Sequence, residues 1–203
     1  MPRLDMHEVR REQICRAAVE VISTKGFDRT TIREVADAAG VSTGTVNHYF
    51  ANKLDLLVQT LVYASDRFIG SVTKDVKANG DEISGLHAYV MISLEQAYDN
   101  SPGWRVWIAA MSEATRSKRV EEVIQRRRQA IYSLLSESFL RIRPELEGAE
   151  EARRAAAREV ECMVSGLGLS VITGERDLRL VQSHRAAVEF ALARLDAIEA
   201  PGP

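Results

Sequence analysis

The segment Thr30–Leu57 constrains the fold of this chain more than any other part of it. Apolar residues at Ile32, Val35, Ala36 and Ala39 follow the i, i+3, i+4, i+7 spacing of one helix face. The segment therefore begins with a short amphipathic helix.

Helix start and stop signals divide the segment further. Thr31, or the threonine before it, is placed to cap the first helix, and Glu34 follows Thr31 at the spacing of a capping box. Gly40 supplies the left-handed backbone that commonly ends a helix. Ser42 then caps a second helix that runs to about Tyr49. Two short helices joined by a tight turn predict a helix-turn-helix, the motif that places its second helix in the DNA major groove.

The second helix has two different faces. Val46, Tyr49 and Phe50 lie on its apolar back, whereas its front is small and polar, with Thr43, Gly44, Thr45, Asn47 and His48. A small polar front lets a helix approach base edges closely.

The same residues carry a family resemblance. The run T-I-x-x-V-A-x-x-A-G-V-S-x-G-x-V-x-H-Y-F-x-N-K-x-x-L, from Thr31 to Leu56 or Leu57, resembles the DNA-binding signature of TetR-family transcriptional regulators. Its S-T-G-x-x-x-H-Y-F part is similar to the BetI-like branch. The resemblance implies a ligand-responsive DNA-binding regulator, usually a repressor that a small-molecule inducer releases from its double-stranded operator. The alternative is a small-molecule sensor or an activator on the same scaffold.

Carried over residue by residue, the resemblance implies a set of DNA contacts: Thr31, Ser42, Thr43, Gly44, Thr45, Asn47, His48, Tyr49 and Lys53. Thr31, His48, Tyr49 and Lys53 match positions that hold phosphates, and Thr43 and Thr45 match positions that contact bases. Asn47 stands where the family commonly has Tyr, and its amide suits adenine in the major groove.

Helical periodicity continues along the rest of the chain, and no segment shows the alternation of a strand. The sequence predicts an all-α fold of about nine helices, with a DNA-binding domain at 1–50 and a ligand-binding and dimerisation domain at 51–203. The later helices are expected over these ranges: 8–25, 52–78, 82–98, a helix from about 104, 118–142, 149–173 and 178–198.

Aromatic residues on the middle helices have two readings. Phe68, Tyr89, Trp104, Trp107 and Met111 either pack an ordinary core or line an inducer cavity, where TetR-like proteins generally place one. An aromatic box suits a quaternary ammonium or a polyamine through cation–π attraction. The polar residues expected to accompany it are His87, Glu95 and Glu113. The run Arg126–Arg128 is predicted to form a solvated or ion-paired face.

The last two helices present apolar residues at helical spacing: Val164, Leu167, Val171, Val188, Leu192 and Leu195. These residues either complete the core of one chain or form a homodimer interface, and the resemblance favours the dimer. Gly166 and Gly168 weaken the helix, by up to ~1 kcal/mol each, which suggests a close approach of another helix.

Composition excludes several other classes of protein. The two cysteines, Cys15 and Cys162, have no metal-ligand spacing, and no phosphate loop, nucleophile elbow or zinc-protease motif occurs, so we expect neither an enzyme nor a metal or other cofactor. Without a signal peptide or a membrane-spanning run, a cytoplasmic protein is expected. Residues 1–55 hold eight basic and eight acidic residues, so the DNA argument depends on their distribution.

Overall fold

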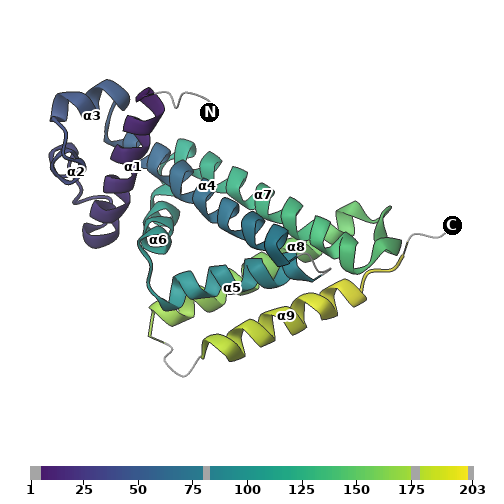
Figure 1. Ribbon diagram of the computed structural model, residues 1–203. Helices are drawn as coiled ribbons and strands as arrows, with labels where there is room; N and C mark the ends of the chain where they lie inside the picture. The colour runs from purple at the N-terminus through teal and green to yellow at the C-terminus, as the bar shows by residue number, and fades with distance from the viewer. Residues whose placement is uncertain (1–5, 80–82, 175–178, 201–203) are drawn as a thin grey trace. The chain divides into compact units, whose positions relative to one another are not determined.

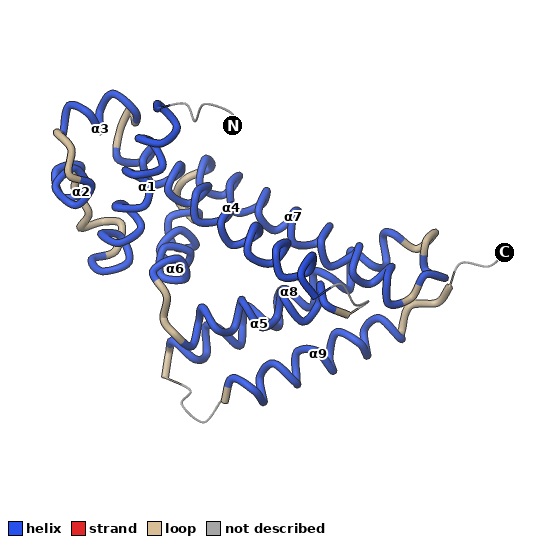
Figure 2. The backbone as a smooth tube through the Cα atoms, in the orientation of Figure 1, coloured by secondary structure: helices blue, strands red, loops and turns tan. Residues whose placement is uncertain are grey.

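The computed structural model describes residues 6–79, 83–174 and 179–200. Every regular element in these ranges is helical, as Figures 1 and 2 show, which confirms the predicted all-α class. The helices are α1 (Met6–Lys25), α2 (Ile32–Ala39), α3 (Thr43–Tyr49), α4 (Lys53–Asn79), α5 (Ser84–Tyr98), α6 (Pro102–Ala114), α7 (Lys118–Ile142), the 3-10 turn η1 (Pro144–Leu146), α8 (Glu150–Ile172) and α9 (Leu180–Asp196). The predicted turns at 79–81 and 174–177 include residues outside the described ranges.

The chain divides by its contacts into two compact units. The first unit comprises Met1–Arg67 and Ser101–Arg126, and the second comprises Phe68–Asn100 and Arg127–Pro203. Helices α4 and α7 contribute to both. This division concerns packing and does not test the predicted division by function at residue 50, which stays a prediction.

In the first unit, α1 packs against α2 and α6, and α2 packs against α3. The core includes fully buried Ile14, Val35, Val46 and Phe50. Burying a side chain of this size contributes about 1.5–3 kcal/mol. The helix-turn-helix is thus fixed by its apolar back, which leaves the polar front of α3 available.

The beginning of α4 is held by polar contacts within the first unit. The Asn52 side chain accepts a hydrogen bond from the Asp55 amide at 2.9 Å, and the Asp55 carboxylate accepts one from the Ala51 amide at 3.1 Å. Arg119 at the start of α7 donates to the same carboxylate at 2.8 Å. The first two bonds satisfy backbone amides at the helix N-terminus, and the third ties α4 to α7.

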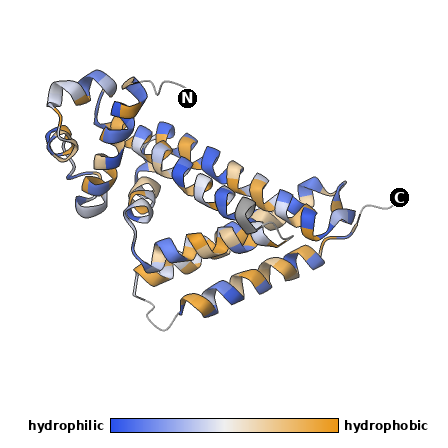
Figure 3. Cartoon of the chain, in the orientation of Figure 1, coloured by the Kyte–Doolittle hydropathy of each residue, from blue (hydrophilic) through white to orange (hydrophobic). Residues whose placement is uncertain are grey.

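In the second unit, α5 packs against both α8 and α9, which also pack against each other. Figure 3 shows α5 as a largely apolar helix, and its Leu86, Val90 and Leu94 are fully buried. Within the described part of the chain, no helix is long and apolar enough to cross a membrane.

Candidate DNA-reading and ligand sites

Helix α2 begins with the predicted capping box. The Thr31 hydroxyl accepts a hydrogen bond from the Glu34 amide at 3.2 Å, and the Thr31 amide donates to the Glu34 carboxylate at 2.9 Å. Glu34 also pairs with Lys25 at the end of α1. The bonds from Lys25 and then Thr31 lower the pKa of Glu34 to about 2, although this carboxylate lies at the surface. A phosphate at Thr31 would therefore have to compete with the Glu34 carboxylate.

The turn between the two helices forms as predicted. Gly40 has φ 65°, and its amide donates to carbonyls of the last turn of α2. A side chain at this left-handed position would strain the backbone. Ser42 caps α3 by accepting from the Thr45 amide at 3.0 Å, and its hydroxyl also lies 2.9 Å from that of Thr45.

Helix α3 displays the predicted front. Thr43, Gly44, Asn47 and His48 are exposed, as is the cap Ser42. Thr45 is half-buried. A front of hydroxyl, amide and imidazole groups is able to donate and accept hydrogen bonds along a groove.

Tyr49 belongs to an aromatic group that the sequence did not indicate. Its ring centroid lies 4.6 Å from that of His7 and 5.3 Å from that of His48. His7 lies in the first turn of α1, which begins before the predicted start at Glu8. The Tyr49 ring thus packs against His7, a residue more than forty positions earlier in the chain. No local sequence signal predicts such a contact.

Lys53 has a contact inside the first unit. Its ammonium donates to the Asp28 carbonyl at 2.7 Å and stands 4.7 Å from the centroid of the Phe27 ring. An ammonium has three donors, so this contact leaves capacity for a phosphate. Lys53 therefore also ties the loop after α1 to the start of α4.

The predicted ligand residues fall in both units. Trp104, Trp107 and Met111 lie on α6 in the first unit, where the two indoles are buried and Met111 is half-buried. The buried indole N–H of Trp104 has no hydrogen-bond partner within the described part of the chain. Buried donors are normally paired, so this one is suited to an acceptor from outside the chain.

Phe68 and Tyr89 lie together in the second unit. Both are buried, and their rings meet edge to face with centroids 6.2 Å apart. Glu161 on α8 is only 2% exposed, and the Ser165 hydroxyl donates to its carboxylate at 3.0 Å. Burial and the Glu161 charge raise the pKa of Tyr89, which keeps the phenol protonated.

The polar residues expected to accompany the aromatic ones are placed elsewhere. His87 and Glu95 are exposed on α5, and Glu113 pairs with Arg116 in the first unit. The arginine run is not one solvated face either. Arg126 is exposed, but Arg127 points inward, with its guanidinium carbon 4.7 Å from the centroid of the Phe68 ring. Sequence reasoning missed Glu161 and Arg127.

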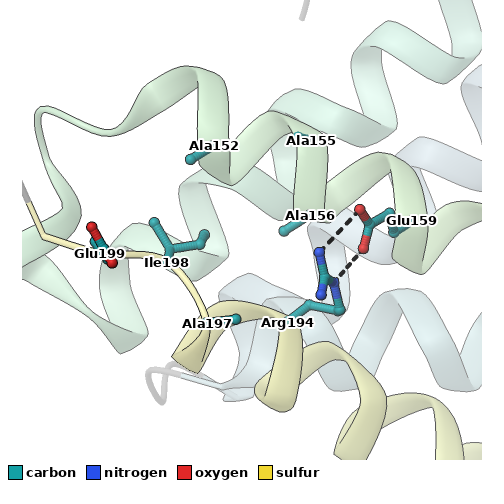
Figure 4. A pocket seen from close by; sticks show the side chains of 8 residues that line it. All are labelled: Ala152, Ala155, Ala156, Glu159, Arg194, Ala197, Ile198 and Glu199. Carbon is teal, nitrogen blue, oxygen red and sulfur yellow. Dashed lines mark hydrogen bonds and ion pairs between the residues drawn. The ribbon is translucent and has the colours of Figure 1, made fainter.

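Figure 4 shows a surface pocket of about 390 Å³ at the start of α8 and the end of α9. Half of its lining residues are alanines, and the ion pair between Arg194 and Glu159 crosses one side, with Nη2 3.1 Å from Oε1. It contains no aromatic residue and none of the predicted ligand residues, so it does not fit the predicted aromatic box.

The predicted dimer residues divide into two sets. Val164, Val188 and Leu195 are buried in the core of the second unit. Leu167, Val171 and Leu192 are half-buried. A dimer interface on these helices would therefore use the second set together with exposed neighbours.

Comparison with known families agrees with this geometry. Residues 14–60 match the model of bacterial regulatory proteins of the tetR family, and residues 84–197 match the C-terminal domain of the BetI-type transcriptional repressor. The chain belongs to the TetR family, in its BetI-type branch. As a TetR-family protein it is a DNA-binding, ligand-responsive transcriptional repressor rather than an enzyme, and the sensor or activator alternative is not favoured.

Individual relatives support the assignment over most of the chain. It is 31% identical over 173 residues to the HTH-type transcriptional regulator BetI of Burkholderia cenocepacia J2315, which covers 83% of this chain and 85% of the relative. It is 30% identical over 177 residues to BetI of Paraburkholderia xenovorans LB400, covering 86% and 88%.

Solved structures share the fold of this TetR-family chain. A transcriptional regulator from Rhodococcus sp. Rha1 superimposes with a TM-score of 0.77 and 24% identity, covering 95% of this chain and 99% of that one. A transcriptional regulator from Saccharomonospora viridis in complex with choline gives a TM-score of 0.74 and 20% identity, covering 90% and 95%.

Proposed function

We propose that this repressor works in the cytoplasm as a homodimer whose two α3 helices read successive major grooves, and that a cationic small molecule releases it from DNA. On the DNA side, the support is the exposed polar front of α3 with Ser42, Thr43, Gly44, Asn47 and His48. The other contacts proposed for DNA are Thr31, Thr45, Tyr49 and Lys53.

The proposed inducer class is a quaternary ammonium or a polyamine. The observation that carries it is the buried pair of rings Phe68 and Tyr89, on which the charge of the buried Glu161 acts, a combination of π-faces and negative charge that suits a desolvated cation. A solved relative of the same fold is in complex with choline, which supports the same chemistry. Trp104, Trp107 and Met111 on α6 are proposed separately as ligand contacts within the first unit, where the buried Trp104 indole N–H has no hydrogen-bond partner among the described residues.

A ligand acts by binding the DNA-free conformation more tightly than the DNA-bound one. The test is a mobility-shift assay with the DNA upstream of the protein's own coding region, titrated with choline, spermidine or octanoate. We expect choline or spermidine to release the DNA and to raise Tm, and octanoate to do neither. Release by octanoate alone would contradict the cationic class.

A further inference from the structure

Four helices of the second unit bring one residue each to a buried charged cluster: Phe68 of α4, Tyr89 of α5, Arg127 of α7 and Glu161 of α8. The proposed function uses the two aromatic residues and the carboxylate for a ligand. It does not use Arg127, the one cation of these four residues.

We propose that Arg127 fills the cation-binding place of this cluster as a ligand built into the chain, and that a cationic inducer binds by displacing its guanidinium. The inference rests on the proposed function for the identity of the inducer. That the cluster binds a cation is a separate claim, because it can be tested without knowing which inducer the protein recognises.

The geometry of Arg127 is that of a bound cation. Its guanidinium carbon lies 4.7 Å from the centroid of the Phe68 ring, inside the ~6 Å range of a cation–π contact. Phe68 is 5% exposed and meets Tyr89 edge to face, so the ring is held in place by its neighbour. The guanidinium therefore covers the aromatic face that a quaternary ammonium would need.

The charges of the cluster favour one cation and no more. Glu161 is 2% exposed, and a buried carboxylate is costly unless an opposite charge compensates it. Burial lowers the pKa of Arg127, while the Glu161 charge acts in the opposite direction and favours its charged form. A second cation beside the guanidinium would add repulsion without a second carboxylate among these four residues. Ligand and guanidinium therefore exclude each other.

Competition of this kind weakens the apparent affinity for inducer. A site that is open in only a fraction of molecules binds with an affinity reduced by that fraction. Suppose that the Arg127 guanidinium leaves the Phe68 ring in about one molecule in ten. Removing the guanidinium then strengthens cation binding to the cluster about tenfold.

The experiment compares Arg127→Gln with Arg126→Gln, a matched variant that removes the same charge from the exposed neighbouring position. Methylguanidinium, the head group of arginine, is added to each protein and Tm is measured. We expect the ion to raise Tm of Arg127→Gln by about 3 °C or more at tenfold excess over its dissociation constant for that variant, and to raise Tm of wild type and Arg126→Gln by no more than about 1 °C. Titration calorimetry with choline should show about tenfold tighter binding to Arg127→Gln than to wild type.

The outcomes separate the two proposals. If methylguanidinium does not stabilise Arg127→Gln, the built-in ligand is disproved, whatever choline does to wild type. If methylguanidinium stabilises it but choline binds neither protein, the cation place stands and the proposed inducer class fails.

Loss of the guanidinium removes a positive charge that acts on buried Glu161, which is expected to destabilise Arg127→Gln and gives it a second readout. If it is unfolded, refolding is followed by circular dichroism with and without methylguanidinium, beside the double variant Arg127→Gln with Glu161→Gln. The proposal is supported if the single variant refolds only when methylguanidinium is present and the double variant refolds without it. Failure of the ion to restore the single variant overturns it.

Discussion

We propose that Asn47 gives this repressor its own operator preference. It is exposed on α3 directly after the buried Val46. We predict that Asn47→Ala reduces discrimination between operator and unrelated DNA by about 1–3 kcal/mol, because an amide contact to a base is lost. The unfolding free energy should stay within about 0.5 kcal/mol of wild type, as for most surface substitutions. Fluorescence anisotropy with both DNAs at fixed salt measures the first quantity.

Lys53→Ala is the matched contrast to Asn47→Ala. A phosphate contact carries no sequence information, so its loss should weaken both DNAs alike and reduce the salt-dependence slope by about one. Equal weakening of both DNAs by Asn47→Ala would assign Asn47 to the phosphate backbone instead of the bases.

Single residues are also where the sequence predicts least. Arg126 and Arg127 are identical neighbours, yet one is exposed and the other lies over Phe68. Charge patterning predicts a solvated face for both, because it does not contain the positions of α4 and α8. Glu161 is buried for the same reason: tertiary neighbours decide its environment.

At the scale of elements the sequence predicts well where caps and breaks are explicit. The range predicted for α7, Lys118–Ile142, agrees with the structure, and Gly40 and Ser42 bound α2 and α3 as expected. The beginning of α1 differs, since the helix starts at Met6 and not at Glu8. Asp5, three residues before Glu8, is a cap signal for the earlier start, whereas the ring contact of His7 with Tyr49 is a long-range interaction that the sequence does not predict.

The capping box of α2 should make the stability of the first unit depend on acid. The pKa of Glu34 falls from 4.5 to about 2 on folding, so its contribution is complete above about pH 4.5 and is lost as pH falls toward 2. Glu34→Gln retains an N3 side chain that can cap but has no charge to titrate. We predict that urea unfolding between pH 5 and 2.5 loses less stability in this variant than in wild type.

Glu20→Gln is the control for that comparison, because Glu20 is exposed on α1 and its carboxylate is not part of the capping box. It should follow the wild-type pH dependence. A Glu34→Gln protein with the wild-type pH dependence would show that the bonds to Lys25 and Thr31 contribute nothing in solution.

At the scale of the whole molecule, the two compact units are invisible in the sequence. Both α4 and α7 pass from one unit to the other without a Gly or Pro break at residues 67–68 or 126–127, the places where the contacts divide. The sequence predicts a single set of ligand residues, but the structure places Phe68 and Tyr89 in one unit and the α6 residues in the other. Periodicity identifies which face of a helix is apolar, but it does not identify the partner of that face.

Dimerisation through α8 predicts a specific response at Gly166. Apart from the adjoining residues and the nearby backbone of the same helix, no atom of the described residues lies within 4 Å of a methyl group built on Gly166, and the same holds for Gly70 in α4, so both sites have room for alanine. Each Gly→Ala substitution should therefore stabilise its helix by up to ~1 kcal/mol. If a partner helix approaches Gly166 closely, Gly166→Ala also overpacks that contact, at about 1–3 kcal/mol, and weakens dimerisation about 5- to 150-fold, whereas Gly70→Ala leaves it unchanged. Sedimentation equilibrium gives the dimer dissociation constants. Equal constants for the two variants would place the partner on a different face of the second unit, because no neighbouring element among the described residues opposes the added methyl group.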